Sequence, residues 1–261
     1  MRGWLIYDKE GAARNAWFIQ RLQEEGAAHG LQITLRVCQK DESFADELPD
    51  FAIVRTVYPQ LNERLEKKGV RVFNNAKTSA LANDKRQTYL ACKRWNIPVL
   101  HTALLAEKFP VVVKSVDGHG GVEVFWANDK NEYQTISRNV TKQGKRFIVQ
   151  TPCDILGKDM RVYAGGGEIV AAVLRSSQTQ FKSNFSLGGK VELAQADETQ
   201  RRIVAQLYDQ LHFDFVGIDF LPSSKGWVLN EIEDAAGARM LYACSDIDIV
   251  KVFIQHVVKS L

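Results

Sequence analysis

Short apolar runs alternate with segments of helical periodicity in the first quarter of the chain. The strand candidates there are Trp4–Tyr7, Leu31–Val37, Phe51–Val54 and Val70–Phe73. Between them, Asn15–Ala28 and Leu61–Lys68 carry apolar residues at helical spacing. The resulting order β-α-β-β-α-β predicts a small α/β domain over residues 1–74.

The pattern continues with a long helix and three more strands. Thr78–Trp95 has helical spacing, and Pro98 then forces an extended exit. The next strand candidates are Pro110–Lys114, Val122–Trp126 and Arg146–Gln150, with a helix over Glu132–Asn139. These elements predict a central subdomain over residues 75–148.

The last part of the chain predicts another sheet and two helices. Met160–Leu174 contains two strands joined at Gly165-Gly166-Gly167, which is typical of a hairpin. The helical candidates are Glu198–Leu211 and Ile247–Leu261. We therefore expect a third segment over residues 149–261 and an α/β (α+β) chain overall.

Three carboxylates stand in a second predicted hairpin. Phe215–Leu221 and Trp227–Glu233 are apolar strand candidates joined by a turn at residues 223–226. Glu231 and Glu233 share a strand face, and the turn brings Asp219 back to about their level. Carboxylates so close repel one another unless a cation lies between them, and hard oxygen ligands suit Mg²⁺. The alternative is a polar sheet edge that faces water.

Composition restricts the class of protein. The 261 residues include 34 basic and 31 acidic ones, which give a net charge of +3 and a pI of about 8.6. This balance does not require a nucleic-acid partner. The four cysteines are far apart and form no CxxC pair, which favours reduced thiols in a cytoplasmic protein. We find no targeting segment and no apolar run of the ~20 residues that span a bilayer.

A glycine-rich loop follows the strand that ends in Lys114. Asp117–Gly121 contains Gly118, Gly120 and Gly121, which let backbone N–H groups approach an anion, although an ordinary hairpin turn is the alternative. His119 in this loop is a less favoured candidate for a catalytic base. Taken alone, Lys114 could be a solvated strand end and Lys85 a solvated helix face. Neither a GxxxxGK[ST] nor a GxGxxG motif occurs.

A further group of polar residues suits phosphoryl transfer. Asp159 and Arg161 share one strand face, and the alternative for them is a surface ion pair. Arg175 ends the partner strand, and Lys182-Ser183-Asn184 follows. A transferred phosphoryl group develops negative charge that such donors stabilise.

These motifs, in this order, resemble the ATP-grasp superfamily over about residues 50–261, and within it the RimK-like ligases. The implied fold is a small N-terminal α/β domain followed by two α+β subdomains that clasp the nucleotide. The implied nucleotide-binding residues are Lys85, Lys114, Gly118, His119, Gly120, Gly121, Gln150, Thr151, Pro152, Cys153, Asp159 and Arg161. The implied catalytic residues are Arg175, Lys182 and Asn184. The implied metal ligands are Asp219, Glu231 and Glu233.

The chain departs from the RimK-like pattern at three places. Thr151 stands where the adenine-binding hinge usually has an acidic residue. Glu233 stands where the family usually has asparagine, which adds a negative charge to the predicted metal site. Ala235-Ala236-Gly237 replaces the usual Ser-Pro-Gly beside the acceptor. The resemblance therefore predicts the class of product less directly than it predicts ATP binding.

The resemblance implies an ATP-dependent carboxylate–amine ligase that works through an acyl phosphate. The expected cofactors are ATP and Mg²⁺, with Mn²⁺ as the alternative metal. The expected partners are a carboxylate substrate and an amine (an amino acid or peptide), without nucleic acid or membrane, and the family favours a homo-oligomer. Two alternatives remain open: a macrocyclase that modifies a precursor peptide, and a non-catalytic ATP-binding regulatory protein.

Overall fold

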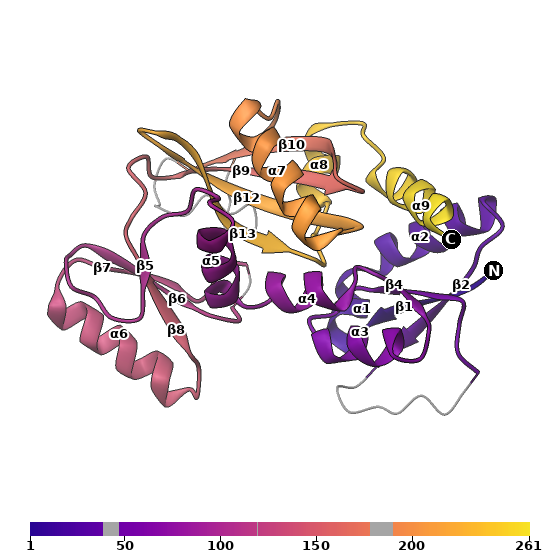
Figure 1. Cartoon of the computed structure of the whole chain (residues 1–261), viewed down its shortest axis with the longest axis horizontal. Coiled ribbons are helices and arrows are strands. Elements are labelled where there is room, and N and C mark those ends of the chain that lie inside the picture. Colours follow the sequence, from indigo (N-terminus) through magenta and orange to yellow (C-terminus); the bar gives the residue numbers. More distant parts are fainter. Residues whose placement is uncertain (39–46, 119, 178–189) are drawn as a thin grey trace.

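The computed structural model describes residues 1–38, 47–118, 120–177 and 190–261. Within these residues the strands form three sheets, two of four strands and one of five. Figure 1 shows the first sheet with its helices at one end of the molecule, the second sheet at the other end, and the third sheet across the top.

The first sheet is parallel, with strand order β2-β1-β3-β4. Its strands are β1 (Arg2–Tyr7), β2 (Gln32–Val37), β3 (Phe51–Val54) and β4 (Arg71–Phe73). Its helices are α1 (Lys9–Arg14), α2 (Ala16–Ala28) and α3 (Pro59–Glu66). All of β3 and nearly all of β1 are buried, as expected of parallel strands covered on both faces. The predicted β-α-β-β-α-β order is confirmed, and only the short α1 is additional.

The predicted single helix over Thr78–Trp95 is wrong. The segment forms α4 (Ala76–Ala82) and α5 (Lys85–Arg94), which are separated at Asn83-Asp84. Asp84 caps α5, because its side chain accepts a 2.9 Å hydrogen bond from the Gln87 backbone N–H. Aspartate satisfies the free N–H groups of a helix start, and so it favours a new helix over continuation. The break places Lys85 at the first position of α5.

The second sheet is antiparallel, with strand order β5-β8-β6-β7. Its strands are β5 (Thr102–Ala103), β6 (Val111–Ser115), β7 (Val124–Ala127) and β8 (Phe147–Gln150). Helix α6 (Lys130–Lys142) packs on it, and its Tyr133 and Ile136 contact a core that contains Val111 and Val113.

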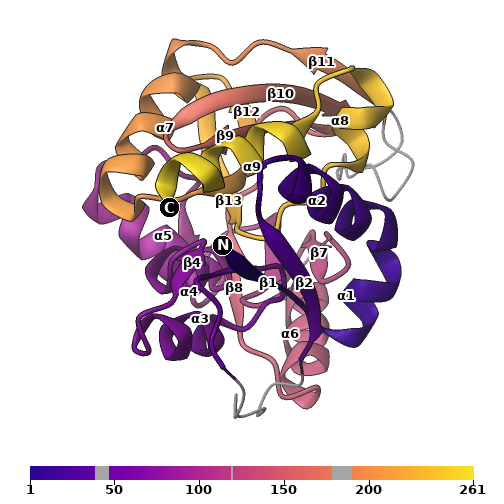
Figure 2. The ribbon, with the colours of Figure 1, turned by 90° about the vertical axis from the view of Figure 1, so that its right-hand side faces the viewer.

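The third sheet has strand order β11-β10-β9-β12-β13. Its strands are β9 (Lys158–Gly165), β10 (Glu168–Ser176), β11 (Lys190–Ala194), β12 (Phe215–Ser223) and β13 (Gly226–Glu233). Helix α7 (Glu198–Leu211) covers one face, and α8 (Arg239–Cys244) and α9 (Ile249–Ser260) cover the other (Figure 2). Both predicted hairpins, β9–β10 and β12–β13, are confirmed.

Helix α9 joins the third sheet to the first sheet. Phe253 and Val257 of α9 share one hydrophobic core with Leu5 of β1 and Leu22 of α2. Both views show α9 beside α2. The first and third sheets are therefore fixed to each other, while the division at residues 74 and 148 stays a prediction. Among the described residues, no helix is both long enough and apolar enough to cross a membrane.

Candidate active site

The β12–β13 hairpin places the three predicted metal ligands on neighbouring strands. Asp219 pairs in register with Glu231, and Gly217 pairs with Glu233. The register shifts between Asp219 and Phe220, where the partner strand continues from Glu231 to Leu229, so Asn230 is the additional residue of a bulge. The predicted alignment of Asp219 with the glutamates is confirmed.

Two arginines connect the carboxylates of this hairpin into one chain of ion pairs. Arg161 bonds Asp219 at 2.6 and 2.7 Å and lies 2.7 Å from Glu233. Arg175 bonds Asp159 at 2.6 and 2.5 Å and lies 2.9 Å from Asp219. Asp159 and Arg161 are each 6% exposed, and each is bonded to a partner on another strand. The alternative of a surface ion pair between these two residues is therefore wrong.

Within this network of ion pairs, the pKa of one carboxylate is lowered and the pKa of another is raised. Burial raises the pKa of Asp219, but Arg161 and Arg175 outweigh it, and the pKa lies well below its ordinary value. The pKa of Glu233 is raised by burial, and Asp219 and Glu231 add to the shift against the opposing charge of Arg161. Asp219 is thus the firmly ionised member, and Glu233 is the member that is easier to protonate.

Both predicted ATP-contacting lysines point toward the β13 strand. Lys114 is 8% exposed, and its Nζ donates to Gln150 Oε1 at 2.6 Å and to Asn230 Oδ1 at 2.7 Å. Burial lowers the pKa of Lys114 to about 8, despite the opposing charge of Glu231. Lys85 Nζ lies 2.8 Å from Glu231 Oε1 and donates to the carbonyl of Gly118 in the glycine-rich loop.

A cleft with an empty volume of about 810 Å³, open solvent included, collects many of the predicted nucleotide-binding residues. The predicted residues that line it are Lys114, Gly120, Gly121, Gln150, Thr151, Pro152, Cys153, Asp159, Asp219, Glu231 and Glu233. Its apolar wall consists of Leu100, Val112, Val124, Trp126, Ile155, Leu156 and Leu221. This mixture of apolar side chains with a few polar groups is typical of a site for a small organic ligand.

Several predicted residues lie elsewhere. Arg161 and Arg175 line a neighbouring cavity rather than this cleft, and Lys85 borders a small pocket behind Lys114. His119, Lys182 and Asn184 lie outside the described residues. Their proposed roles stay predictions.

Asn230 is the residue of this cleft that sequence reasoning missed. In a regular strand it would point away from Glu231, but the bulge lets its side chain meet Lys114. In the sequence, Asn230 is marked only by its position between Leu229 and Glu231. That position does not predict a bulge.

The second cavity has an empty volume of about 1350 Å³, open solvent included, and is rich in arginine. Its charged lining residues are Arg14, Arg55, Arg161, Arg175, Arg239, Asp8, Glu233 and Asp234. Gly120 and Glu233 line both this cavity and the cleft, so the two spaces meet there.

Arg55 is a buried cation of this cavity, as Arg161 and Arg175 are. It is 9% exposed, and its Nη2 donates to the carbonyl of Ala236 at 2.7 Å. Within the described ranges it has no carboxylate at ion-pair distance. A buried guanidinium without an anionic partner is a suitable receptor for a substrate carboxylate.

The carboxylates of the β12–β13 hairpin could bind a metal ion only if they gave up their present ion pairs with Arg161 and Lys85. Across the part of the chain that the structure describes, no three His, Cys, Asp or Glu residues are gathered as a metal site. Arg161 stands between Asp219 and Glu233, and Lys85 lies against Glu231. However, Glu231 Oε1 is buried and has the ion pair with Lys85 but no well-directed hydrogen bond among the described residues, and carboxylate oxygens are the ligands that Mg²⁺ prefers. The donor set therefore fits Mg²⁺.

Comparison with known proteins identifies the family. The profile of the RimK-like ATP-grasp domain matches residues 85–257, and the chain therefore belongs to this family. An uncharacterised protein of Mycoplasma genitalium is 29% identical over 98% of this chain and 92% of that one. The coenzyme gamma-F420-2:alpha-L-glutamate ligase of Methanocaldococcus jannaschii is 27% identical over 69% of this chain and 67% of that one.

Solved structures agree on the fold. The ATP-grasp ligase PsnB, in complex with a phosphomimetic precursor variant, Mg and ADP, has a TM-score of 0.72 and 13% identity, covering 98% of this chain and 97% of that one. The predicted family, ATP-grasp fold and ligase class are confirmed. ATP and Mg²⁺ are supported as the general cofactors of such a ligase.

Proposed function

We propose that this protein uses ATP to join a carboxylate to an amine, with ATP in the cleft and the carboxylate substrate in the arginine-rich cavity. The observation that carries the proposal is the meeting of the two spaces at Gly120 and Glu233. A γ-phosphate at the end of the cleft would there face a carboxylate entering from the cavity. Such positioning is the main requirement of phosphoryl transfer.

The reaction has two steps. A carboxylate oxygen of the substrate attacks the γ-phosphorus of ATP, the bond to the β-phosphate oxygen breaks, and an acyl phosphate and ADP form. The nitrogen of the amine then attacks the acyl carbon, inorganic phosphate leaves, and an amide forms with loss of a proton. Water would hydrolyse the acyl phosphate, and so the enclosure of this junction matters.

Particular side chains would perform particular tasks. Lys114 and Lys85 would hold the phosphates, and each would exchange a present partner for a phosphate oxygen. Arg175, which lines the second cavity, would stabilise the charge on the transferred group. Asp219, Glu231 and Glu233 would hold Mg²⁺, which neutralises phosphate charge in such reactions.

The substrate class follows from the cavity. Five arginines against three carboxylates line it, and Arg55 is the buried one that has no carboxylate at ion-pair distance among the described residues, so an acid is the expected substrate. The names of relatives make glutamate the first amine to test. We propose that the product is an amide of an amino acid, and we expect a cytoplasmic protein that uses Mg²⁺ in preference to Mn²⁺.

Release of ADP tests the proposal. The purified protein is incubated with ATP, Mg²⁺ and pools of carboxylic acids, with and without amino acids, and ADP and new amide masses are measured. We expect ADP to form only with the correct acid, and an amide only with the amine. Glu231→Gln should reduce both by about 10²–10³-fold, whereas Arg138→Ala on the exposed face of α6 should change neither. ATP binding without ADP release in any pool would favour a regulatory protein and overturn the ligase.

A further inference from the structure

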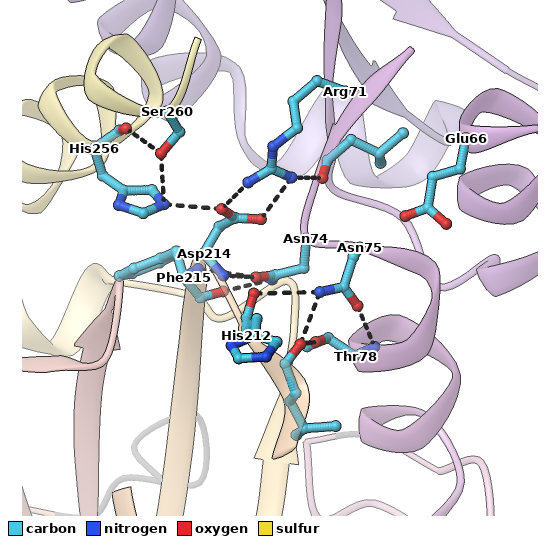
Figure 3. A network of polar contacts seen from close by, with 12 residues as sticks. Glu66, Arg71, Asn74, Asn75, Thr78, His212, Asp214, Phe215, His256 and Ser260 are labelled. Atoms are coloured by element: carbon cyan, nitrogen blue, oxygen red, sulfur yellow. Dashed lines mark hydrogen bonds and ion pairs between the residues drawn. The ribbon is translucent and has the colours of Figure 1, made fainter. Parts of the chain in front are cut away.

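Asn74 connects the N-terminal domain to the strands of the predicted metal site. It follows β4 directly, and it is 4% exposed. Figure 3 shows its side chain directed at Phe215, the first residue of β12, and at Asp214 directly before it. Its own carbonyl accepts a 2.9 Å hydrogen bond from Asn62 Nδ2 of α3, which fixes the backbone from behind.

The side-chain amide of Asn74 uses both its donor and its acceptor atoms. Oδ1 accepts from the backbone N–H groups of Asp214 at 2.6 Å and Phe215 at 2.9 Å. Nδ2 donates to the carbonyl of Phe215 at 2.6 Å and to the carbonyl of Asp234 at 3.1 Å. An amide has two donor hydrogens and a carbonyl with two lone pairs, so its capacity is filled.

These bonds lie just beyond the end of the β12–β13 ladder. The last register pair of the two strands is Gly217 with Glu233. Past this pair, Asn74 Nδ2 bonds the carbonyls of both Phe215 and Asp234, which could not bond each other because both are acceptors. The side chain of Asn74 therefore joins the two chain segments where the ladder ends and holds the backbone after Glu233.

The chain after Glu233 forms one wall of the second cavity, which Asp234, Ala235 and Gly237 line. Other contacts hold it further along: Asn83 Nδ2 bonds Asp234 Oδ1 at 3.0 Å, and Arg55 bonds the Ala236 carbonyl at 2.7 Å. Asn74 is the anchor on the Asp234 backbone, directly beside Glu233, where cleft and cavity meet.

We infer that Asn74 is a positioning residue of the ligase: its amide holds β12 and the Asp234 backbone together, and so fixes Glu233 and the cavity wall at the junction of the two substrate sites. This inference rests on the proposed function for its catalytic consequence. Asn74 would thus contribute to catalysis from the N-terminal domain without touching either substrate.

Asn75 offers a matched control in the adjacent position. Its Nδ2 donates to the carbonyls of Leu211 and His212, and its Oδ1 caps α4 at Thr78. It thus joins the same N-terminal segment to the C-terminal part of the chain through a similar set of hydrogen bonds. None of these bonds involves β13 or Asp234. Loss of domain docking alone would therefore affect both asparagine variants.

The test compares Asn74→Ala and Asn75→Ala in the full chain. Both should lower the midpoint of thermal unfolding. At a temperature where both are folded, Asn74→Ala should reduce kcat about tenfold or more at saturating ATP, with the affinity for ATP changed less than twofold, because it misplaces groups at the junction. Asn75→Ala should keep kcat within about twofold. Equal kcat values for the two variants would overturn the inference.

Two further measurements keep the result independent of folding and of the proposed reaction. Asn74→Asp retains the Oδ1 acceptor but loses the donors to Phe215 and Asp234, so it should reduce kcat as Asn74→Ala does. Amide hydrogen exchange over residues 233–238 should increase in both Asn74 variants and not in Asn75→Ala, whatever reaction the protein catalyses. Unchanged hydrogen exchange over these residues would refute the positioning role of Asn74. A wild-type protein without ligase activity, but with this exchange pattern, would instead refute the proposed function.

Discussion

Arg161 and Asp219 face each other in register across β9 and β12, and two hydrogen bonds of 2.6 and 2.7 Å join their side chains. Both residues are almost fully buried, so each charge depends on the other. Arg161 also lies 2.7 Å from Glu233 and thereby holds two of the predicted metal ligands. The guanidinium thus places a positive charge between two of the three carboxylates of the sequence pattern.

The first prediction concerns stability. Arg161→Met should destabilise the fold by about 3–5 kcal/mol, because it leaves Asp219 and Glu233 buried without their main counter-charge. Denaturant unfolding would measure it, with Lys67→Met as the control. Lys67 pairs with Glu63 on the surface, where both side chains are more than half exposed, and its loss should change stability by less than about 1 kcal/mol.

Magnesium should act on this variant more strongly than on the wild type. With Arg161 absent, Mg²⁺ can supply the missing positive charge to Asp219 and Glu233, so added Mg²⁺ should raise the unfolding midpoint of Arg161→Met more. Equal shifts in the two proteins would show that these carboxylates do not share a metal ion.

The second prediction separates Glu231 from Glu233. Glu231 has a buried oxygen that is paired with Lys85 but accepts no well-directed hydrogen bond from a described residue, whereas Glu233 is paired with Arg161 and has a raised pKa because of burial. Glu231→Gln should reduce kcat by about 10²–10³-fold. Glu233→Asn should weaken Mg²⁺ binding only several-fold and retain activity, since it removes a charge but keeps an oxygen ligand. A Mg²⁺ titration of ADP release compares them, and equal losses would refute the distinction.

The third prediction is a pH dependence from Lys114. Its pKa is about 8 in the folded protein because of burial, against about 10.4 in an unfolded chain. Between these values the unfolded chain holds the extra proton, so the contribution of Lys114 to stability rises with pH from about 8 to about 10.4. The burial penalty is therefore present in full below pH 8.

Nucleotide binding should show the opposite trend. A phosphate needs the protonated amine, so the affinity for ATP should fall above pH 8, and binding should take up a proton there. Calorimetry at pH 8.5 in two buffers of different ionisation enthalpy would detect this uptake. Lys114→Arg keeps its charge and should lose the effect. Identical proton uptake in both proteins would assign it to another group.

The hydrophobic pattern was sufficient for the two hairpins, because strand periodicity and glycine turns are local signals. It failed at Asn83-Asp84, where aspartate capping divides a helix that apolar spacing alone would continue. It also could not show which acid each arginine meets, since Arg161 and Asp219 are 58 residues apart and come together only through strand register. The role of Asn74 is equally non-local.

The fourth prediction tests the acid-binding cavity. Arg55→Ala should raise KM for the carboxylate substrate at least about tenfold, because charged hydrogen bonds are worth about 1.5–3 kcal/mol. The affinity for ATP should stay unchanged, since Arg55 lines the cavity and not the cleft. Steady-state kinetics with each substrate varied in turn separate these effects. Arg55→Lys should restore little, because a single ammonium nitrogen cannot reproduce the planar guanidinium, which bonds Ala236 through one nitrogen and leaves others for a carboxylate. A higher KM for ATP instead would place the nucleotide in the second cavity.

The fifth prediction compares two glycines with left-handed backbone. Gly120 has φ of 67° and Gly144 has φ of 73°, and a Cβ on either would meet no atom within 4 Å. Alanine should therefore destabilise the protein similarly at both positions, by about 1–2 kcal/mol. Only Gly120 lies where cleft and cavity meet, so only there should the changed backbone disturb phosphate binding.

Steady-state kinetics and unfolding of Gly120→Ala and Gly144→Ala separate the two effects. We expect Gly120→Ala to reduce kcat/KM for ATP about tenfold or more, whereas Gly144→Ala, in the turn after α6, should keep the wild-type value. Because the backbone strain is matched, a difference in activity reports on position alone. Equal activity would show that the glycine-rich loop does not contact the phosphates, and the cleft would then have to bind ATP through Lys114, Lys85 and the β12–β13 carboxylates without it.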